Sequence, residues 1–281
     1  MSAPAKIDPN EFRLMRDYIE KSCGIHLTDD KMYLVCTRLT TLMVERGCNS
    51  FADLYHKAVA DNTHVLRDKI VEAMTTHETF WFRDTSPFVI MDEVVLRELA
   101  EEIKLGKRSK IKIWSAACST GQEPYSVAMT VLELARKYNS LKPEHVEITA
   151  TDISSTVLYL ATAGRYNSLA MSRGLGKDYE NRYFEPDGKV WAIKNDVKKM
   201  VRFKKMNLQG DFSLIGKQDI ILCRNVLIYF SDEFKKDILQ RIAVLLRPNG
   251  NLFLGASESI INYTKEYDML RHTIGLYYKV K

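Results

Sequence analysis

Beyond residue 83 the sequence alternates short apolar runs with helix-length segments, and no other feature limits the possible folds as strongly. Strands separated by helices predict a parallel β-sheet with crossover helices. An aromatic-rich run at 274–280 is followed by no helix, and we expect it to be an antiparallel last strand. The runs that predict the parallel strands are 111–115, 146–151, 219–223 and 251–255. We therefore expect an α/β domain over residues 84–281.

Residues 1–83 lack this alternation and have the pattern of amphipathic helices. Asp8, Pro9 and Glu11 supply an N-cap, a first-turn proline and a capping-box acid. The helical pattern continues through 28–47, 51–60 and 65–74. These features predict a small all-α domain that ends in a linker at residue 83.

One segment of the α/β region breaks the alternation. Residues 173–205 carry ten Lys or Arg against five Asp or Glu. They contain two strand-like runs, 190–193 and 201–204, and a turn signal at 185–188. We expect these runs to form a small antiparallel subdomain inserted at about 173–205.

Composition narrows the class of protein further. No run approaches the ~20 apolar residues needed to cross a bilayer, and residues 1–10 have no signal-peptide core. The five cysteines have no disulfide-framework spacing and the six histidines no paired spacing, so we expect a cytoplasmic protein with no metal site and no direct membrane insertion. The basic excess of the net charge of +5 lies in residues 84–281, which hold 30 basic against 24 acidic residues. It suits an anionic partner, whether nucleic acid, acidic protein or lipid, and it equally fits a slightly basic solvated surface.

Two expected strand ends carry residues suited to a nucleoside. The first strand ends in small residues and opens a helix, which creates a ligand crevice in α/β sheets. Gly121 stands alone there, without the GxGxxG that a diphosphate needs, and Glu123 could meet a ligand ammonium. Asp152 ends the second strand, where an acid accepts hydrogen bonds from ribose hydroxyls. Gly121 and Asp152 together favour an adenosyl ligand over a plain strand–helix turn and a helix N-cap.

Two further segments place polar residues where a reacting group could be oriented. The apolar run at 219–223 predicts a central strand, and it is followed by Arg224, Asn225 and Tyr229. The aromatic segment 74–83 ends in Arg83, which could hold a carboxylate in a bidentate grip. Packing is the competing interpretation of the aromatic run.

These segments, in this order and spacing, resemble the chemotaxis receptor methyltransferases, the CheR family. The motifs are TTHETFWFR, SAACSTGQEPYS, ATDIS and CRNVLIYF, and the likeness covers nearly the whole chain. The resemblance implies a Rossmann-like class I methyltransferase domain that depends on S-adenosylmethionine (SAM). It also implies a small antiparallel β-subdomain inserted in that domain and an all-α N-terminal domain that recognises the receptor. The implied reaction forms methyl esters on glutamate side chains of chemoreceptors, with S-adenosylhomocysteine (SAH) as product and no metal.

Site residues are carried over from the family where the motifs match. Arg83 and Tyr229 are implied at the reaction centre and Arg38 in receptor recognition. His77 stands where relatives often have Asn, and Val44 stands where some relatives have a basic residue. The residues implied to bind the cofactor are His77, Thr79, Arg83, Gly121, Glu123, Asp152, Asn207, Leu208, Asn225 and Val226.

The implied partner is the cytoplasmic helical region of membrane chemoreceptors, bound by a monomer, with no nucleic acid. The turn at 186–189 is too short for the loop with which some relatives grip a receptor-tail peptide, so we expect no dependence on such a tether. Two alternatives stay open. One is an RNA or small-molecule methyltransferase whose basic stretch 173–205 tracks phosphates, and the other is a non-catalytic SAM-binding adapter.

Overall fold

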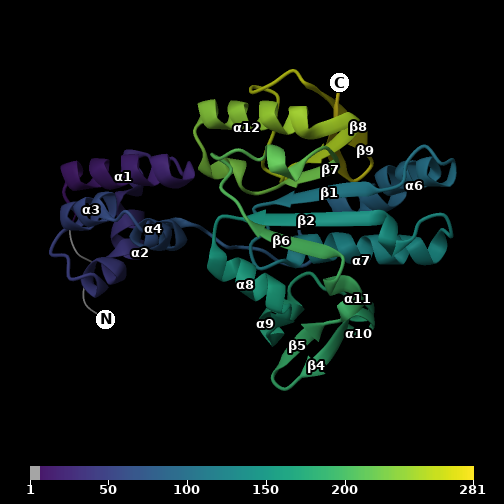
Figure 1. The fold of residues 1–281 in the computed structure, drawn as a ribbon, viewed down its shortest axis with the longest axis horizontal. Helices are drawn as coiled ribbons and strands as arrows, with labels where there is room; N and C mark the ends of the chain where they lie inside the picture. Colours follow the sequence, from purple (N-terminus) through teal and green to yellow (C-terminus); the bar gives the residue numbers. More distant parts are fainter. Residues whose placement is uncertain (1–6) are drawn as a thin grey trace.

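The computed structural model describes residues 7–281 and contains a helical N-terminal unit beside a larger α/β unit (Figure 1). The helical unit buries its own apolar core, which includes Phe12, Leu39 and Phe51. Its helices are α1 (Pro9–Cys23), α2 (Met32–Glu45), α3 (Phe51–Ala60) and α4 (Val65–Met74). The all-α start expected from the sequence is confirmed.

Helix α1 shows why this unit forms where it does. The Asp8 side chain accepts hydrogen bonds from the backbone N–H groups of Asn10 and Glu11, and the Glu11 carboxylate accepts one from the backbone N–H of Asp8. This is a complete capping box, which satisfies N–H groups that a helix start leaves free. Gly24 ends the helix in the left-handed region, at φ 78°. The position of this C-terminus matters because it borders the cavity described below.

The α/β unit is built on a seven-stranded mixed sheet in the order β6-β2-β1-β7-β8-β10-β9. Neighbouring strands from β6 to β8 are parallel, and β10 is antiparallel to both β8 and β9. The strands are β1 (Ile111–Ala116), β2 (Val146–Asp152), β6 (Val201–Lys205), β7 (Gln218–Cys223), β8 (Leu246–Phe253), β9 (Tyr267–His272) and β10 (Gly275–Val280). The expected parallel sheet with an antiparallel C-terminal strand is confirmed.

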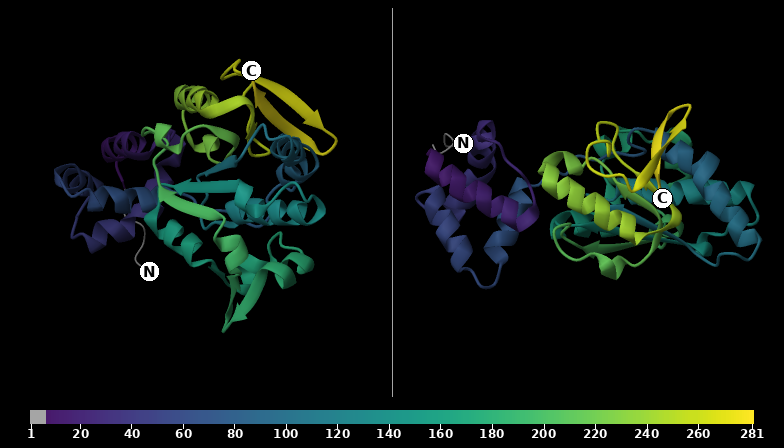
Figure 2. Two further views of the ribbon diagram at one scale, coloured as in Figure 1. Left: turned by 45° about the vertical axis from the view of Figure 1, so that its right-hand side comes forward. Right: turned by 90° about the horizontal axis from the view of Figure 1, so that it is seen from above.

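Helices cover both faces of this sheet (Figures 1 and 2). On one face α7 and α8 pack against β2 and β6, and on the other α12 packs against β8. A π-helical turn at Met91–Val95 joins α5 to α6. The helices that cover the main sheet are α5 (Ser86–Ile90), α6 (Leu96–Lys104), α7 (Gln122–Lys137), α8 (Ser155–Ala163) and α12 (Asp232–Leu245). Successive side chains of a strand enter opposite cores, since Ile113 joins one apolar cluster and Trp114 the other.

A second, three-stranded antiparallel sheet has the order β3-β5-β4. Its elements and the short helices around it are β3 (Arg165–Tyr166), α9 (Ser168–Ser172), α10 (Lys177–Tyr183), β4 (Phe184–Asp187), β5 (Val190–Ile193) and α11 (Asn195–Lys198). Asp187 pairs with Val190, so the β4–β5 hairpin turns on two residues alone. The rest of the predicted turn signal, 185–187, is strand.

The structure corrects two expectations about strands. The run 201–204 is not part of the small sheet, because β6 pairs in parallel with β2 at the edge of the main sheet. The small sheet instead begins earlier than 173, at β3. Strand β9 was also missed, since its sequence YDMLRH shows little alternation and only Tyr267 of it is buried. Within residues 7–281 no helix is long and apolar enough to span a membrane.

Candidate active site

A cavity of about 950 Å³, including its open mouth, lies at the carboxyl ends of four parallel strands. Residues that follow β1, β2, β6 and β7 line it, together with Cys23 and Ile25 from the end of α1. The order of the sheet reverses between β1 and β7, and such a switch point is where open α/β sheets bind ligands.

The loop from β1 to α7 has an unusual backbone. Ala117 and Ser119 have positive φ angles of 54° and 50°, and Gly121 has 92°. Such angles are costly for residues with a Cβ, and they concentrate at functional sites. Gly121 is the N-cap of α7, and a Cβ there would lie 3.0 Å from the Cβ of Ala161 on α8. Gly121 therefore shapes the loop and lets α8 approach, and it does not itself line the cavity.

Asp152, at the end of β2, presents a buried carboxylate to the cavity. Its Oδ2 accepts from the N–H of Ser119 at 2.9 Å and its Oδ1 from the N–H of Ser154 at 3.0 Å. Burial raises the pKa of Asp152 above its ordinary value, although these two N–H groups act in the opposite direction. Each carboxylate oxygen still has a free lone pair, so the group fits a pair of ribose hydroxyls.

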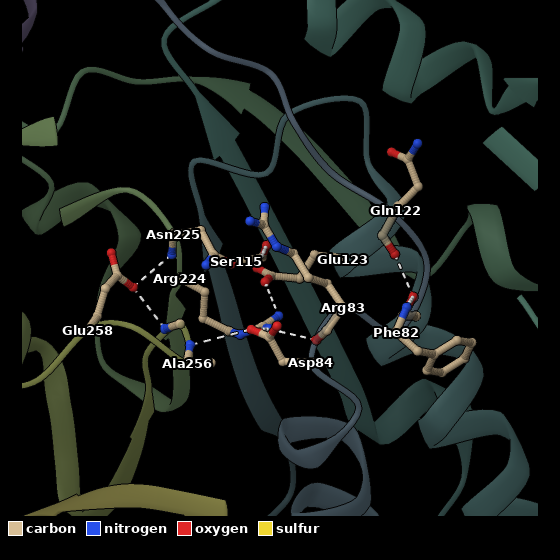
Figure 3. Close-up of polar contacts among 12 residues, drawn as sticks. Phe82, Arg83, Asp84, Ser115, Gln122, Glu123, Arg224, Asn225, Ala256 and Glu258 are labelled. Carbon is tan, nitrogen blue, oxygen red and sulfur yellow. Dashed lines mark hydrogen bonds and ion pairs between the residues drawn. The ribbon is translucent and has the colours of Figure 1, made fainter. Parts of the chain in front are cut away.

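A buried arginine joins the first loop to the strand-tip residues after β7 (Figure 3). Arg224 donates to Glu123 Oε2 at 2.7 Å, to Asp84 Oδ2 at 2.9 Å and to the carbonyl of Arg83 at 2.6 Å. The other oxygen of Glu123 accepts from Ser115 Oγ at 2.7 Å. The sequence placed Glu123 and Arg224 at strand ends, but it showed neither their ion pair nor the contribution of Asp84.

The segment after β7 is held by Glu258, which our sequence reasoning gave no role. Its carboxylate accepts from the N–H groups of Asn225 (2.7 Å), Val226 (3.0 Å) and Gly255 (2.8 Å). Asn225 has a positive φ of 57°, and the Glu258 bonds stabilise this turn. Glu258 lies outside the four motifs that carried the resemblance, so no signal in the sequence suggested this contact.

The linker between the two units forms another wall. His77 Nε2 lies 2.9 Å from Thr75 Oγ1, and the carbonyl of His77 accepts from Ser119 Oγ at 3.0 Å. Arg38 reaches the same linker, donating to the carbonyls of Met74 at 2.6 Å and Thr75 at 3.2 Å. The guanidinium of Arg38 is thus engaged within the chain, and its predicted role in receptor recognition stays a prediction.

The end of α1 closes the cavity on the side where the sequence predicts adenine. Asn207 Nδ2 donates to the carbonyl of Ser22 at 2.9 Å, and Gln209 Nε2 donates to that of Glu20 at 2.8 Å. The N–H of His26 donates to the carbonyl of Tyr229 at 2.9 Å. These contacts make the helical unit part of the site. Sequence reasoning missed them, because backbone carbonyls at a helix end leave no pattern in the sequence.

The cavity brings together most of the residues predicted from the sequence. Those that line it are His77, Thr79, Arg83, Glu123, Asp152, Asn207, Leu208, Asn225, Val226 and Tyr229. Gly121 and Arg38 lie outside the lining. No cluster of three or more His, Cys, Asp or Glu side chains arranged for a metal occurs among residues 7–281.

The donors and acceptors of the wall fit SAM. Asp152 suits the ribose, and Glu123 suits an ammonium group within a largely buried setting. A switch-point cavity with these groups defines a nucleoside-binding site of the kind found in Rossmann-like SAM-dependent methyltransferases.

Comparison with known proteins gives the family. Residues 77–276 match the family described as CheR methyltransferase, SAM binding domain, and residues 10–75 match its all-alpha domain. The chain therefore belongs to the CheR family of SAM-dependent chemotaxis protein methyltransferases. The fold class, family and cofactor expected from the sequence are confirmed.

Similar proteins match along nearly their whole length. The chain is 45% identical to a chemotaxis protein methyltransferase of Vibrio parahaemolyticus, with 98% of each chain covered. It is 44% identical to chemotaxis protein methyltransferase 1 of Pseudomonas aeruginosa, over 96% of this chain and 98% of that protein. A chemotaxis protein methyltransferase of Borreliella burgdorferi is 32% identical, over 94% and 93% of the two chains.

Proposed function

We propose that this protein transfers the methyl group of SAM to glutamate side-chain carboxylates of chemoreceptors, forming methyl esters. The substrate glutamates lie in the cytoplasmic helical region of the receptor, and the enzyme acts as a cytoplasmic monomer. The observation that carries the proposal is that Arg83 and Tyr229 line the same cavity as Asp152 and Glu123. This supports the proposal because a guanidinium, which can hold a carboxylate, lies in the cavity that fits the cofactor.

Methyl transfer to a carboxylate depends mainly on how the two reactants are positioned. SAM supplies a methyl group on a sulfonium, which a carboxylate can attack without a base. A glutamate side chain, with an ordinary pKa of about 4.3, is already ionised at neutral pH. Holding the two reactants in line can therefore provide much of the rate, roughly 7–11 kcal/mol in favourable cases.

The residues of the wall divide this work between them. Asp152 and Glu123 bind the ribose and the ammonium of the cofactor. Arg83 orients the incoming carboxylate, and Tyr229 limits its approach to the line of transfer. Nη1 of Arg83 donates to the carbonyl of Glu78 at 2.8 Å, and the remaining N–H groups of Arg83 are left for a substrate.

The structure favours a protein over a nucleic acid as substrate. The basic excess of 173–205 was the reason to consider RNA. Half of its ten basic side chains form ion pairs with acids of the same chain: Arg173 with Glu78, Lys177 with Glu180, Arg182 with Glu133, Lys199 with Asp196 and Lys205 with Asp68. These five ion pairs reduce the positive charge that could follow a phosphate backbone.

The small sheet supports independence from a receptor-tail tether. The β4–β5 turn consists of Gly188 and Lys189 alone. A two-residue turn provides no loop that could wrap around a peptide. Calorimetry with a receptor-tail pentapeptide should show no binding, whereas tight binding would contradict this part of the proposal.

The reaction can be tested by its product. Chemoreceptor-containing membranes are incubated with the enzyme and methyl-labelled SAM, then treated with mild alkali. A carboxyl ester releases volatile labelled methanol, and this is the result we expect. Label that survives alkali would place the methyl group on nitrogen or sulfur. No label, with SAM binding shown separately, would favour the adapter or RNA alternative.

A further inference from the structure

A second arginine lies beside Arg83. The guanidinium carbon of Arg83 is 5.4 Å from the centroid of the Phe80 ring, and that of Arg173 is 5.1 Å from the same centroid. Arg173 directly follows α9, in the segment between strands β3 and β4 of the small sheet. One aromatic ring therefore carries two cations from distant parts of the sequence, each attracted by its π-system.

Glu78 connects the two arginines. Arg173 Nη2 forms an ion pair with Glu78 Oε1, and Arg83 donates to the backbone carbonyl of Glu78. The hydrogen bond from Arg173 holds the pKa of Glu78 below its ordinary value, and the charge of Arg83 acts in the same direction. Glu78 also lines the cavity. Its carboxylate is thus an anion within electrostatic reach of the arginine that we assign to the substrate.

The backbone keeps Arg173 in this place. The N–H of Trp81 donates to the carbonyl of Arg173 at 3.2 Å. The next residue, Gly174, has φ +81°, and a Cβ there would lie 2.0 Å from the carbonyl oxygen of Trp81. Such close approach requires glycine. The position of Arg173 is therefore set by tight backbone packing against the aromatic segment.

We propose that Arg173 is a positioning residue that occupies the Glu78 carboxylate and so keeps Arg83 available for the carboxylate of the substrate. The inference rests on the proposed function, since it assumes an anionic substrate at Arg83. Without Arg173, the Glu78 carboxylate forms an ion pair with the Arg83 guanidinium, and the substrate carboxylate must compete with it. The fraction of enzyme that can bind substrate falls accordingly.

A double-mutant comparison tests this role. Initial rates of ester formation on receptor membranes are measured by alkaline methanol release at saturating SAM, so that changes in SAM affinity do not contribute. We expect Arg173→Ala to lower kcat/KM for the receptor about fivefold, in keeping with a partly exposed ion pair. In the Glu78→Gln background the same substitution should lower kcat/KM for the receptor less than about twofold, because no carboxylate is left to compete for Arg83.

Matched variants separate this role from a structural one. Arg182→Ala removes another arginine of the same region, whose ion pair with Glu133 lies outside the cavity lining, and it should leave kcat/KM unchanged. If Arg173→Ala lowers the melting temperature, the comparison is repeated with Arg173→Met, which retains packing over Phe80.

Three results would overturn the inference alone. They are an unchanged rate in Arg173→Ala, an equal loss with and without the Glu78 charge, and a loss of the same size in Arg182→Ala. Absence of any alkali-labile ester with the unmodified enzyme would overturn the proposed function, and the inference with it.

Discussion

At the scale of single residues, the site depends on charges that are buried and paired. Arg224 is almost wholly enclosed, its side chain being 1% exposed, and it bridges Glu123 and Asp84. A buried ion pair is weak evidence for stability, because the cost of removing both charges from water offsets their attraction. Here it ties the linker residue Asp84 to the loop that carries Glu123.

Asp152→Asn should weaken SAH binding about tenfold or more, because hydrogen bonds to a charged group are worth ~1.5–3 kcal/mol each. Burial raises the pKa of Asp152, so affinity in the unmodified protein should fall as the pH drops through this raised value and the acceptor is lost. Calorimetry from neutral pH to about pH 4 checks this. Identical pH profiles for the two proteins would remove Asp152 from ribose binding.

The same shift has a consequence for stability in the absence of ligand. A carboxyl group with a raised pKa binds its proton more tightly in the folded state than in the unfolded chain. The free energy of unfolding therefore decreases as pH rises from the ordinary pKa through the folded pKa of Asp152, and the penalty is complete above it. Denaturant titrations of Asp152→Asn should lack this slope. A slope that persists would have to be assigned to another group.

The sequence predicted much of the site at this scale because strand ends have a recognisable pattern. Asp152 and Asn225 lie within two residues of the ends of apolar runs, so their place at one edge of the sheet could be expected. Asp84 and Glu258 could not be placed in the same way, because they act across long sequence distances from irregular segments. Nothing in their local sequence indicates which N–H or guanidinium group they bind.

At the scale of elements, the apolar runs that predicted strands were those buried on both faces. All six residues of β7 are buried, and the run stands out in the sequence. Strand β6 lies at the edge of the main sheet and is basic, with only Val201 buried. Because its basic residues continue those of the segment that forms the small sheet, the sequence pattern predicts it in that sheet instead. Edge strands commonly carry Lys and Arg because these charges discourage pairing with another chain.

Glu258→Gln should loosen the turn after β7, since an amide can accept from fewer N–H groups and presents a donor toward one of them. We expect faster hydrogen exchange at Asn225, Val226 and Gly255, and a several-fold lower kcat, because the turn leads to Tyr229. Each lost hydrogen bond to the charged group is worth ~1.5–3 kcal/mol. Unchanged exchange at these amides would show that the turn does not need the carboxylate.

At the scale of the whole molecule, two units share one cavity. The helical unit contributes Cys23 and Ile25 to the lining, and Gln209 ties the end of α1 to the α/β unit. The ion pair of Lys205 with Asp68 also connects the two units. The domain pattern could be predicted from periodicity, whereas this docking could not, because it uses backbone carbonyls and single polar side chains.

Gln209→Ala should weaken SAH binding about two- to tenfold although Gln209 does not line the cavity, since a net hydrogen bond is worth ~0.5–1.5 kcal/mol. Lys217→Ala is a suitable control, because Lys217 donates to Val244 within the α/β unit. Calorimetry of both variants measures the difference. Equal affinities for the two would mean that docking of the helical unit does not contribute to cofactor binding.

The most direct measurement is peptide mapping of a chemoreceptor after reaction with SAM that carries a deuterated methyl group, using the unmodified enzyme and Arg83→Ala. We predict deuteromethyl esters on glutamates of the receptor's helical region. We also predict about a hundredfold lower initial rate for Arg83→Ala, with SAH binding partly retained in calorimetry. Label on other side chains, or a rate close to that of the unmodified enzyme in Arg83→Ala, would contradict the assignment of this cavity to glutamate methylation through Arg83.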